Sequence, residues 1–393
     1  MKTVYVDNNA TTKVAPEVLE AMLPYFSELY GNPSSMHFFG GQVQKSVNEA
    51  REKAADFLGA DASEVVFTSC GTESDNAAIL GTLDSYPEKR HFITTRVEHP
   101  AVGNVSSYLG RKGYRVTGLS VDREGRLDLD ELRESITEET VLVSIMYANN
   151  ETGVIFPIEE IGEIVKAKGI PFHTDAVQAA GKIPLNMKKS KIDMLSISGH
   201  KLHAPKGIGV LYIRKGTKFS PFLIGGHQEK GRRGGTENVP YIIGFGKACE
   251  LAKKHLDEEN TRVKALRDYL EAKLLEKIPN TLVNGERVHR LPNTVSVSFE
   301  YVEGESILLL LSDLGICASS GSACTSGSLE PSHVLRAMGV PFTAAHGSIR
   351  FSLSIYNTKE EMDYIIEHLP PIIQKLRDIS PFWKDYLKSQ GKR

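Results

Sequence analysis

Cysteine is scarce in this sequence. The 393 residues include only Cys70, Cys249, Cys317 and Cys324, and no two of them form a C-x-x-C pair. The missing pair argues against a zinc knuckle or a thioredoxin-like dithiol, and so few cysteines in a long chain argue against a disulfide framework. Because a single cysteine is usually a small buried hydrophobic side chain, only a cysteine that its surroundings cannot bury calls for a chemical role.

A strong charge of one sign and long hydrophobic runs are also missing. The net charge is −2, so no surface for nucleic acid or membranes is indicated. No apolar run reaches the roughly 18 residues that a spanning helix needs. Met1–Thr12 lacks the charged and then apolar layout of a signal peptide. We therefore expect a cytoplasmic protein that binds neither nucleic acid nor membranes.

Two kinds of hydrophobic segment alternate in the first half of the chain. Hydrophobic residues make up 40% of the sequence, which is enough for a substantial core. The predicted strands are Val65–Thr68, Phe92–Thr95, Val116–Leu119, Val141–Ile145, Pro171–Thr174, Met194–Ile197 and Val210–Ile213. Amphipathic helical stretches between them include Gln42–Leu58, Glu73–Leu83, Asp128–Ser135 and Ile158–Lys168. This alternation predicts an α/β fold with a mainly parallel sheet, whose ligand site lies at the carboxyl ends of the strands.

The rest of the chain has a different pattern. A long helical pattern, Pro240–Lys277, leads to strands at Thr294–Phe299 and Ser348–Ser352, helices at Gly304–Leu314 and Lys359–Arg377, and a Gly/Ser-rich stretch at Ser319–Ser328. These elements predict a smaller α+β domain, followed by a solvated basic tail. We expect a large domain at 14–258 and a small domain at 259–393 that also includes residues 1–13.

Two segments place polar residues at predicted strand ends. After Val65–Thr68 comes a turn with Gly71 and Thr72 that opens a helix, and the N–H groups of a helix start favour a phosphate. An ordinary helix cap would have the same composition. Asp175 follows the strand Pro171–Thr174 and suits the nitrogen of a pyridine-ring cofactor, with Gln178 near a ring substituent. An isolated aspartate there would more often cap a helix.

A third segment carries a lysine among small residues. Lys201 follows Ser198 and His200, and such a lysine can form a Schiff base with an aldehyde once it is deprotonated. His200 and His203 also form an H-x-x-H pair. Because no acidic residue lies near them in the sequence, we predict no metal site.

Together these segments have the layout of fold-type I pyridoxal-phosphate (PLP) enzymes, and the chain resembles the NifS/IscS cysteine desulfurases in particular. The resemblance covers nearly the whole chain, in family order. Its motifs are Asp7–Thr12, Gly31–Ser35, Thr72–Ser74, Glu98–His99, Asn149–Gly153, the Asp175 and Lys201 segments, Arg233–Asn238 and Ser320–Cys324. It implies a large domain with a mainly parallel seven-stranded sheet and a smaller α+β C-terminal domain.

The resemblance also implies a role for each matching residue. Lys201 would be the Schiff-base lysine and proton shuttle, and His99 would stack on the pyridine ring and act in acid–base steps. Asp175 would pair with the ring nitrogen and Gln178 with the phenolic oxygen. The phosphate would be held by Gly71, Thr72, Ser198 and His200, joined by Thr236 from the second subunit of a homodimer. Asn150 would touch cofactor and substrate, and Arg350 would bind the carboxylate of L-cysteine, although without the family Arg350 would be interpreted as a surface arginine.

Cys324 decides the predicted reaction. It lies in Ser319–Ser328, where no neighbour could bury a structural cysteine, so we expect an exposed and mobile loop that spans 319–333 and resembles the long-loop group of the family. The resemblance implies a thiolate that takes the substrate sulfur as a persulfide. The predicted activity is conversion of L-cysteine to L-alanine, with sulfur passed to an iron–sulfur scaffold or another acceptor protein.

Alternatives stay open at this point. A selenocysteine lyase or a class-V aminotransferase would share the cofactor site, but the aminotransferase would yield a keto acid instead of alanine. A non-catalytic protein that has kept a PLP fold is a further alternative, against which the intact Lys201, Asp175, His99 and Cys324 argue. The sequence does not indicate which sulfur-accepting pathway is served.

Overall fold

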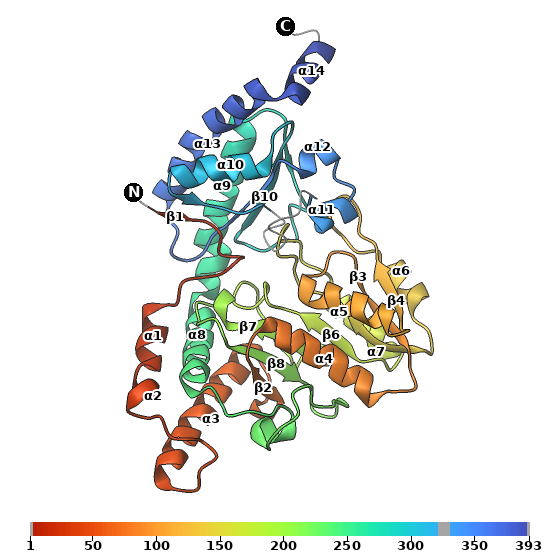
Figure 1. The fold of residues 1–393 in the computed structure, drawn as a ribbon, viewed down its shortest axis with the longest axis vertical. Coiled ribbons are helices and arrows are strands. Elements are labelled where there is room, and N and C mark those ends of the chain that lie inside the picture. The colour runs from red at the N-terminus through yellow and green to blue at the C-terminus, as the bar shows by residue number, and fades with distance from the viewer. Residues whose placement is uncertain (1–2, 321–330, 391–393) are drawn as a thin grey trace.

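A seven-stranded sheet forms the centre of the larger part of the molecule (Figure 1). The computed structural model describes residues 3–320 and 331–390. The strand order is β2-β8-β7-β6-β5-β3-β4, and β8 runs antiparallel to both of its neighbours while the other pairs are parallel. The strands are β2 Val65–Thr68, β3 His91–Thr95, β4 Arg115–Leu119, β5 Thr140–Ser144, β6 Phe172–Asp175, β7 Met194–Ser198 and β8 Gly209–Ile213. The predicted mainly parallel α/β sheet is confirmed, with strand ends shifted by about one residue, a normal uncertainty for such bounds.

Helices cover both faces of this sheet, because alternate strand residues point to opposite sides. One face packs on α4 (Gly71–Ser85) and α5 (Pro100–Arg111), and its core includes Val66 and Phe92. The other face packs on helices that include α3 and α8, and its core includes Val65 and Phe67. The helices on that second side are α3 Phe38–Leu58, α6 Leu129–Ser135, α7 Ile158–Ala167 and α8 Val239–Glu258. Burial on both faces leaves every residue of six strands inaccessible to solvent, and only the edge strand β4 is largely accessible.

A second hydrophobic core lies around a smaller sheet. The antiparallel order is β12-β10-β9, with β9 Thr281–Val283, β10 Thr294–Phe299 and β12 Ser348–Ser352. The helices of this part are α9 Lys264–Lys277, α10 Gly304–Asp313 and α13 Lys359–Ile379. Near the N-terminus, β1 (Val4–Tyr5) pairs in parallel with β11 (Ile316–Cys317), and Val4 and Val6 belong to the second core. The predicted division at residue 259 stays a prediction.

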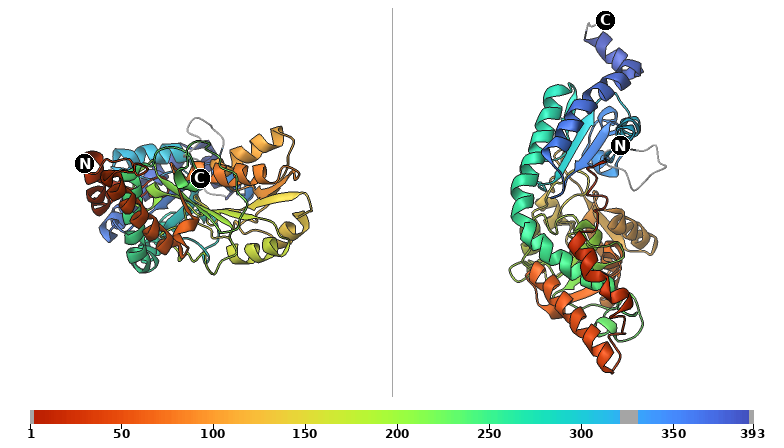
Figure 2. Two further views of the ribbon diagram at one scale, coloured as in Figure 1. Left: turned by 90° about the horizontal axis from the view of Figure 1, so that it is seen from below. Right: turned by 90° about the vertical axis from the view of Figure 1, so that its left-hand side faces the viewer.

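One nearly continuous helix connects the two cores (Figure 2, right). Helix α8 passes into α9 through a π-helical segment, Glu259–Val263. The sequence pattern Pro240–Lys277 predicted the helix but not this insertion, since a π-turn alters the local hydrogen bonding without changing the amphipathic composition.

Several short elements were not predicted from the sequence. They are α1 Pro16–Met22, α2 Pro24–Ser27, α11 His333–Ala337, α12 Phe342–Ala345, α14 Pro381–Ser389, and the 3₁₀ segments Ala62–Glu64, Gly199–Lys201 and Gln228–Gly231. Helix α14 lies in the tail that we expected to be merely solvated. Its start has a recognisable signal, since the Ser380 hydroxyl accepts a hydrogen bond from the Trp383 N–H at 3.4 Å ahead of a proline in the first turn.

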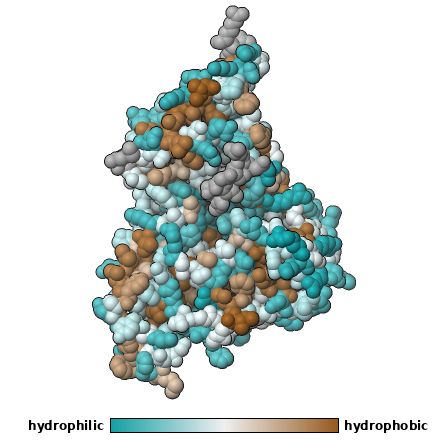
Figure 3. Space-filling model, in the orientation of Figure 1, coloured by the Kyte–Doolittle hydropathy of each residue, from teal (hydrophilic) through white to brown (hydrophobic). Residues whose placement is uncertain are grey.

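The surface of the molecule is mixed in character. On the face drawn in Figure 3, apolar residues form separate patches within a largely hydrophilic surface. Within residues 3–320 and 331–390, no helix is both long and apolar enough to cross a membrane.

Candidate active site

A cavity of about 620 Å³ lies where the N-terminal segment and Arg350 of β12 meet the carboxyl ends of β6 and β7 and the starts of α4 and α5. This is the edge where a doubly wound sheet binds its ligand. Ten of the residues predicted from the sequence line it, namely Gly71, Thr72, His99, Asn150, Asp175, Gln178, Ser198, His200, Lys201 and Arg350. Residues far apart in the chain therefore come together as the family pattern implied.

Gly71 opens helix α4 at one side of the cavity. A Cβ atom at this position would lie 2.9 Å from Val177 Cγ2 and 3.3 Å from Ser198 Cβ, so only a glycine fits here without displacement. The preceding residue, Cys70, caps the helix because its Sγ accepts a hydrogen bond from the Glu73 N–H at 3.4 Å. The close packing brings the first turn of α4 against Ser198 at the end of β7, and its N–H groups make that turn suitable for an anion.

His200 lies at the same side of the cavity. Its Nδ1 is 3.1 Å from the hydroxyl of Thr11. Burial, followed by the charge of Lys201, lowers the pKa of His200 to about 4. The ring is therefore neutral at neutral pH and can donate or accept one hydrogen bond at each nitrogen.

Asp175 is the last residue of β6, and Gln178 lies in the turn that follows it. Both are nearly inaccessible to solvent. The Val177 N–H donates to Asp175 Oδ1 at 2.9 Å. Burial raises the pKa of Asp175, while His99 and Lys201 oppose that rise. Gln178 Nε2 donates to the Asn9 carbonyl at 3.0 Å, and its Oε1 has no hydrogen-bond partner among the described residues. A buried amide oxygen without a partner is costly, so this position calls for a donor from a bound molecule.

Lys201 and His99 supply an amine and an imidazole. The Lys201 Nζ donates to the carbonyls of Ala10, at 2.7 Å, and Asn9. His99 is the N-cap of α5, and its Nδ1 accepts from the Ala101 N–H at 3.1 Å. That bond places the proton of the neutral ring on Nε2, and burial lowers the pKa of His99.

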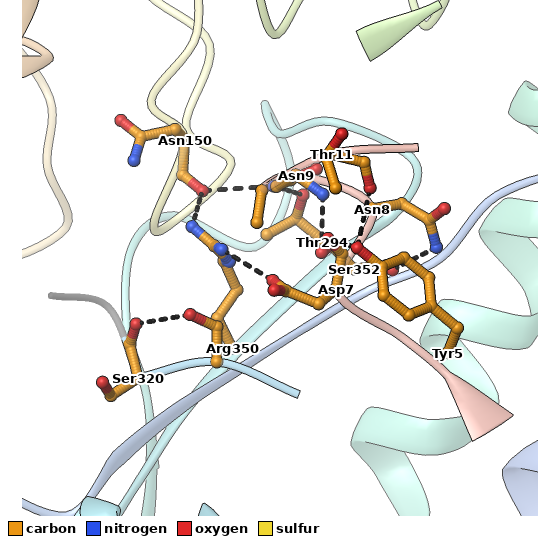
Figure 4. Close-up of polar contacts among 12 residues, drawn as sticks. Tyr5, Asp7, Asn8, Asn9, Thr11, Asn150, Thr294, Ser320, Arg350 and Ser352 are labelled. Atoms are coloured by element: carbon orange, nitrogen blue, oxygen red, sulfur yellow. Dashed lines mark hydrogen bonds and ion pairs between the residues drawn. The ribbon is translucent and has the colours of Figure 1, made fainter. Parts of the chain in front are cut away.

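Arg350 is held by the N-terminal segment (Figure 4). Its Nη2 lies 2.9 Å from Asp7 Oδ1, and its Nη1 donates to the Asn150 carbonyl at 3.0 Å. The Asn9 side chain donates to the same carbonyl at 3.1 Å. Only 3% of Arg350 is exposed, so its interpretation as a surface arginine is wrong. Asp7–Thr12 carried the family motif without assigned roles, and the structure places it within the site.

The amino-acid sequence matches the aminotransferase class-V model over residues 4–365. The chain belongs to this family. It is 64% identical over 385 residues to a "Cysteine desulfurase" of Trichormus azollae, covering 98% of this chain and 96% of that protein. It is 58% identical over 384 residues to "Cysteine desulfurase NifS" of Azotobacter vinelandii, with the same coverage of 98% and 96%.

Solved structures agree. A "NIFS-LIKE PROTEIN" has a TM-score of 0.90 and 43% identity, and the match covers 95% of this chain and 100% of that one. A structure called "SspA in complex with cysteine" has a TM-score of 0.80 and 37% identity, covering 90% and 99% of the two chains. These matches confirm the predicted family and the fold-type I architecture.

Class-V aminotransferases use PLP, and the cavity fits it. The features compatible with a phosphorylated pyridine are the unpartnered Gln178 Oε1, the close packing at Gly71 and the buried Asp175 carboxyl.

Three buried carboxyl groups in or beside the cavity were given no role by the sequence analysis. Burial, followed by the charge of Asp175, raises the pKa of Asp75 well above its usual range. Burial raises the pKa of Glu98 to about 8, despite hydrogen bonds from the Met146 N–H and the Thr95 hydroxyl. It also raises the pKa of Glu151 to about 7. Glu98 and Glu151 lie in the family motifs Glu98–His99 and Asn149–Gly153, which gave them no role, and Asp75 directly follows the motif Thr72–Ser74.

Among the described residues, one predicted residue, Thr236, does not line the cavity. Thr236 is exposed and lies on the loop before α8. Cys324 falls within 321–330, outside the described residues. The neighbouring residues on each side do contact the site. Ser319 exchanges two backbone hydrogen bonds with Arg350, at 2.7 and 3.2 Å, and the Ser332 hydroxyl donates to the Glu151 carboxyl.

Proposed function

We propose that this protein is a PLP-dependent cysteine desulfurase, which converts L-cysteine to L-alanine and takes the sulfur as a persulfide on Cys324. The observation that carries the proposal is the convergence of Lys201, His99, Asp175 and Arg350 on one cavity in a chain 64% identical to a "Cysteine desulfurase". An amine, an imidazole, a buried carboxyl and a guanidinium are the groups that amino-acid chemistry on PLP needs.

Each part of the cofactor would be bound by residues of the cavity. Gly71, Thr72, Ser198 and His200 would bind the phosphate, and His99 would lie on the ring. Asp175 would keep the ring nitrogen protonated because the pair of opposite charges favours the ionised carboxylate that burial alone disfavours. Gln178 would meet the phenolic oxygen. When bound, PLP supplies an electron sink for the charge that remains after the substrate loses its α-proton.

Lys201 would bind the cofactor covalently and then move the α-proton. Its Nζ donates to the Asn9 and Ala10 carbonyls, which hold the amine over the cavity. Once released by the incoming amino acid, the neutral amine can take the α-proton and return it. His99, whose Nδ1 is occupied by the Ala101 N–H, would offer its Nε2 proton to the reacting groups.

Arg350 and Asn150 would orient the substrate. A guanidinium binds a planar carboxylate with two parallel hydrogen bonds, and Arg350 is buried at the cavity wall. It is already paired with Asp7, so the substrate carboxylate would share this cation with an existing partner. Binding at a fixed cation orients the Cβ–S bond towards the attacking thiolate.

Sulfur transfer would be a displacement between two sulfur atoms. The Cys324 thiolate attacks the sulfur of the substrate, an S–S bond forms and the Cβ–S bond breaks. The electron pair of the broken bond stays on the substrate, which takes up a proton and leaves as alanine. L-cysteine and the enzyme thiol thus become L-alanine and an enzyme persulfide, with no external oxidant or reductant.

The assembly and the partners are part of the same proposal. The enzyme would be a cytoplasmic homodimer in which Thr236 of each subunit completes the phosphate site of the other. The large domain would span 14–258, and the small domain 259–393 together with 1–13. The persulfide would be passed to an iron–sulfur scaffold or another sulfur-acceptor protein.

The test is the release of alanine and sulfide from L-cysteine in the presence of dithiothreitol, on the wild-type protein and Cys324→Ala. Equal amounts of both products from the wild type, lost in a variant that keeps the visible absorbance of bound PLP, would support the proposal. Equal activity of the two proteins would refute the role of Cys324. 3-Mercaptopyruvate in place of alanine, formed only when a 2-oxo acid is present to accept the amino group, would indicate an aminotransferase.

A further inference from the structure

The loop that carries Thr236 is held to the phosphate-side turn of its own subunit by one ion pair. Arg233 Nε lies 2.8 Å from Glu73 Oε1, and Arg233 Nη2 lies 3.2 Å from Glu73 Oε2. Glu73 is the third residue of helix α4 and follows Gly71 and Thr72. The pair therefore joins two segments that are 160 residues apart in the sequence.

Glu73 is bound on both sides. Its Oε2 also accepts from the Ser69 N–H at 2.8 Å, and its own N–H donates to Cys70 Sγ at 3.4 Å. Only 9% of the Glu73 side chain and 24% of the Arg233 side chain are exposed. Burial by itself would raise the pKa of Glu73, but the hydrogen bonds from Arg233 and Ser69 outweigh it and lower that pKa. The carboxylate is thus ionised at neutral pH, and the bond to Arg233 is fully charge-assisted.

A second contact holds the same loop at its other end. Glu229 forms a two-point pair with Arg51, at 2.6 and 2.8 Å, and accepts from the Phe67 N–H of β2 at 3.2 Å. Glu229 is 7% exposed and has a left-handed φ of 49°, a costly conformation for a residue with a side chain. The loop thus contacts β2 through Glu229 and α4 through Arg233, on both sides of the turn that would receive the phosphate.

The backbone between Arg233 and Thr236 has little conformational freedom. The Gly234 N–H donates to the Leu223 carbonyl at 2.9 Å, and the Gly235 N–H donates to Gln228 Oε1 at 3.1 Å. Gly235 has φ +107°, which favours glycine. Since Thr236 follows Arg233 by only three residues, we expect a displacement of Arg233 to move Thr236 as well.

We propose that Glu73 and Arg233 are positioning residues that form a clamp between the phosphate-binding turn of one subunit and the Thr236 loop which that subunit offers to its partner. This inference rests on the proposed function, because Thr236 must reach the second phosphate site. The consequence is that a defect in the clamp of one subunit weakens phosphate binding in the other.

The first experiment separates phosphate positioning from general damage. Apo forms of Glu73→Gln, Arg233→Gln and the double variant are titrated with PLP and with pyridoxal, which lacks the phosphate. Glu250→Gln is the matched control, since it removes an exposed carboxylate paired with Lys53 and Lys247. Each single variant should lose about 10-fold in PLP affinity, the scale of one charge-assisted hydrogen bond, and the double variant should lose no more than either.

Pyridoxal affinity should stay within about twofold of the wild type in all four proteins, since the ring contacts are unchanged. Equal losses for PLP and pyridoxal, or additive losses in the double variant, would overturn the clamp. If a neutral variant does not fold, Arg233→Lys keeps the charge but not the two-point geometry. This variant should show a smaller, PLP-specific loss, and an unchanged PLP affinity would overturn the inference.

The second experiment tests action across the interface with hybrid dimers. One subunit carries Lys201→Ala together with Arg233→Gln, so that the covalently held PLP is confined to the wild-type subunit. Faster release of that PLP than from a hybrid with Lys201→Ala alone would support the clamp. A parallel hybrid with Lys201→Ala and Thr236→Ala tests the assignment of Thr236 itself.

The two hybrids give distinguishable failures. If the Thr236 hybrid releases PLP faster and the Arg233 hybrid does not, the clamp is wrong and the donation of Thr236 stands. If neither does, the donation of Thr236 fails, and the clamp across the interface fails with it. Cysteine desulfurase activity can be retained in that case, so the main proposal is judged separately by alanine and sulfide release.

Discussion

Substitution of Gly71 by alanine tests whether close packing shapes the phosphate-side turn. The added Cβ would lie 2.9 Å from Val177 Cγ2 and 3.3 Å from Ser198 Cβ, whereas carbon atoms in favourable contact are about 3.5–4.0 Å apart. The methyl group must therefore push α4 away from the turn that follows Asp175. Overpacking of this kind typically costs about 1–3 kcal/mol.

The helix propensity of alanine opposes this strain. The difference between the two free energies gives the expected change in stability. Alanine within a helix is favoured over glycine by about 0.5–1 kcal/mol, which offsets part of the strain in the free protein. It does not restore the position of the N–H groups that would meet the phosphate. We therefore expect PLP affinity to fall by about 10-fold, equivalent to roughly 1.4 kcal/mol, and the apo protein to lose up to about 2 kcal/mol of stability.

The matched control is Gly41→Ala. Gly41 lies in α3, and no atom is within 4 Å of the point that an added methyl group would occupy. This substitution should therefore leave PLP binding unchanged and raise the free energy of unfolding by about 0.5–1 kcal/mol. PLP titration of the apo proteins and urea unfolding provide the two measurements. If Gly71→Ala binds PLP as the wild type does and gains stability like Gly41→Ala, the packing argument is refuted.

Three further substitutions probe charge in the two cores. Arg350→Lys loses the two-point geometry, so the KM for L-cysteine should rise about 10-fold or more with the absorbance of bound PLP unchanged, and an unchanged KM would exclude Arg350 from carboxylate binding. Because burial raises the pKa of Glu98 to about 8, the folded apo protein holds a proton that the unfolded chain releases near its ordinary pKa. Wild-type stability should therefore fall relative to Glu98→Gln as the pH rises from the ordinary pKa of 4.5 to about 8. Parallel curves of stability against pH from urea unfolding would contradict this. The Glu271 carboxylate, 2% exposed, accepts two hydrogen bonds from Arg290 and one from Arg287. Arg290→Met removes the two-point partner and should cost about 3 kcal/mol of unfolding free energy, whereas a loss below about 1 kcal/mol would show that Arg287 suffices.

The sequence was sufficient for the sheet because its strands depend on local patterns. The residues of the cavity were predicted from the family resemblance instead, since the local patterns at Gly71 and Asp175 are equally those of helix caps. Six of the seven strands are runs of buried residues, and only the edge strand β4 is largely accessible. Asp175 ends β6 and Lys201 follows β7, and the carboxyl ends of these parallel strands share one edge. The roles of Asn9 and Ala10 could not be found in this way. They act on Lys201 through their backbone carbonyls, which every residue type possesses.

The ion pairs between distant segments could not be predicted from the sequence either. The pattern at Arg233–Asn238 carried a family likeness, but nothing in it indicates that Arg233 meets Glu73. The pairing of Asp7 with Arg350 spans 343 residues. Exposed arginines far outnumber buried ones, so burial of Arg350 follows only from the position of β12 beside the N-terminal segment.

The N-terminal segment explains how one site can depend on two hydrophobic cores. Val4 and Val6 pack in the second core, while the Thr12 N–H donates to the His200 carbonyl, at 2.9 Å, beside the large sheet. Between these points Asp7 holds Arg350, and the next residues accept hydrogen bonds from Lys201 and Gln178. A shift of one core relative to the other would therefore move the guanidinium relative to the lysine amine through the few residues of this segment. Since catalytic groups tolerate misplacement of only about 1 Å, the relative position of the two cores is a condition for the proposed reaction and not merely for stability.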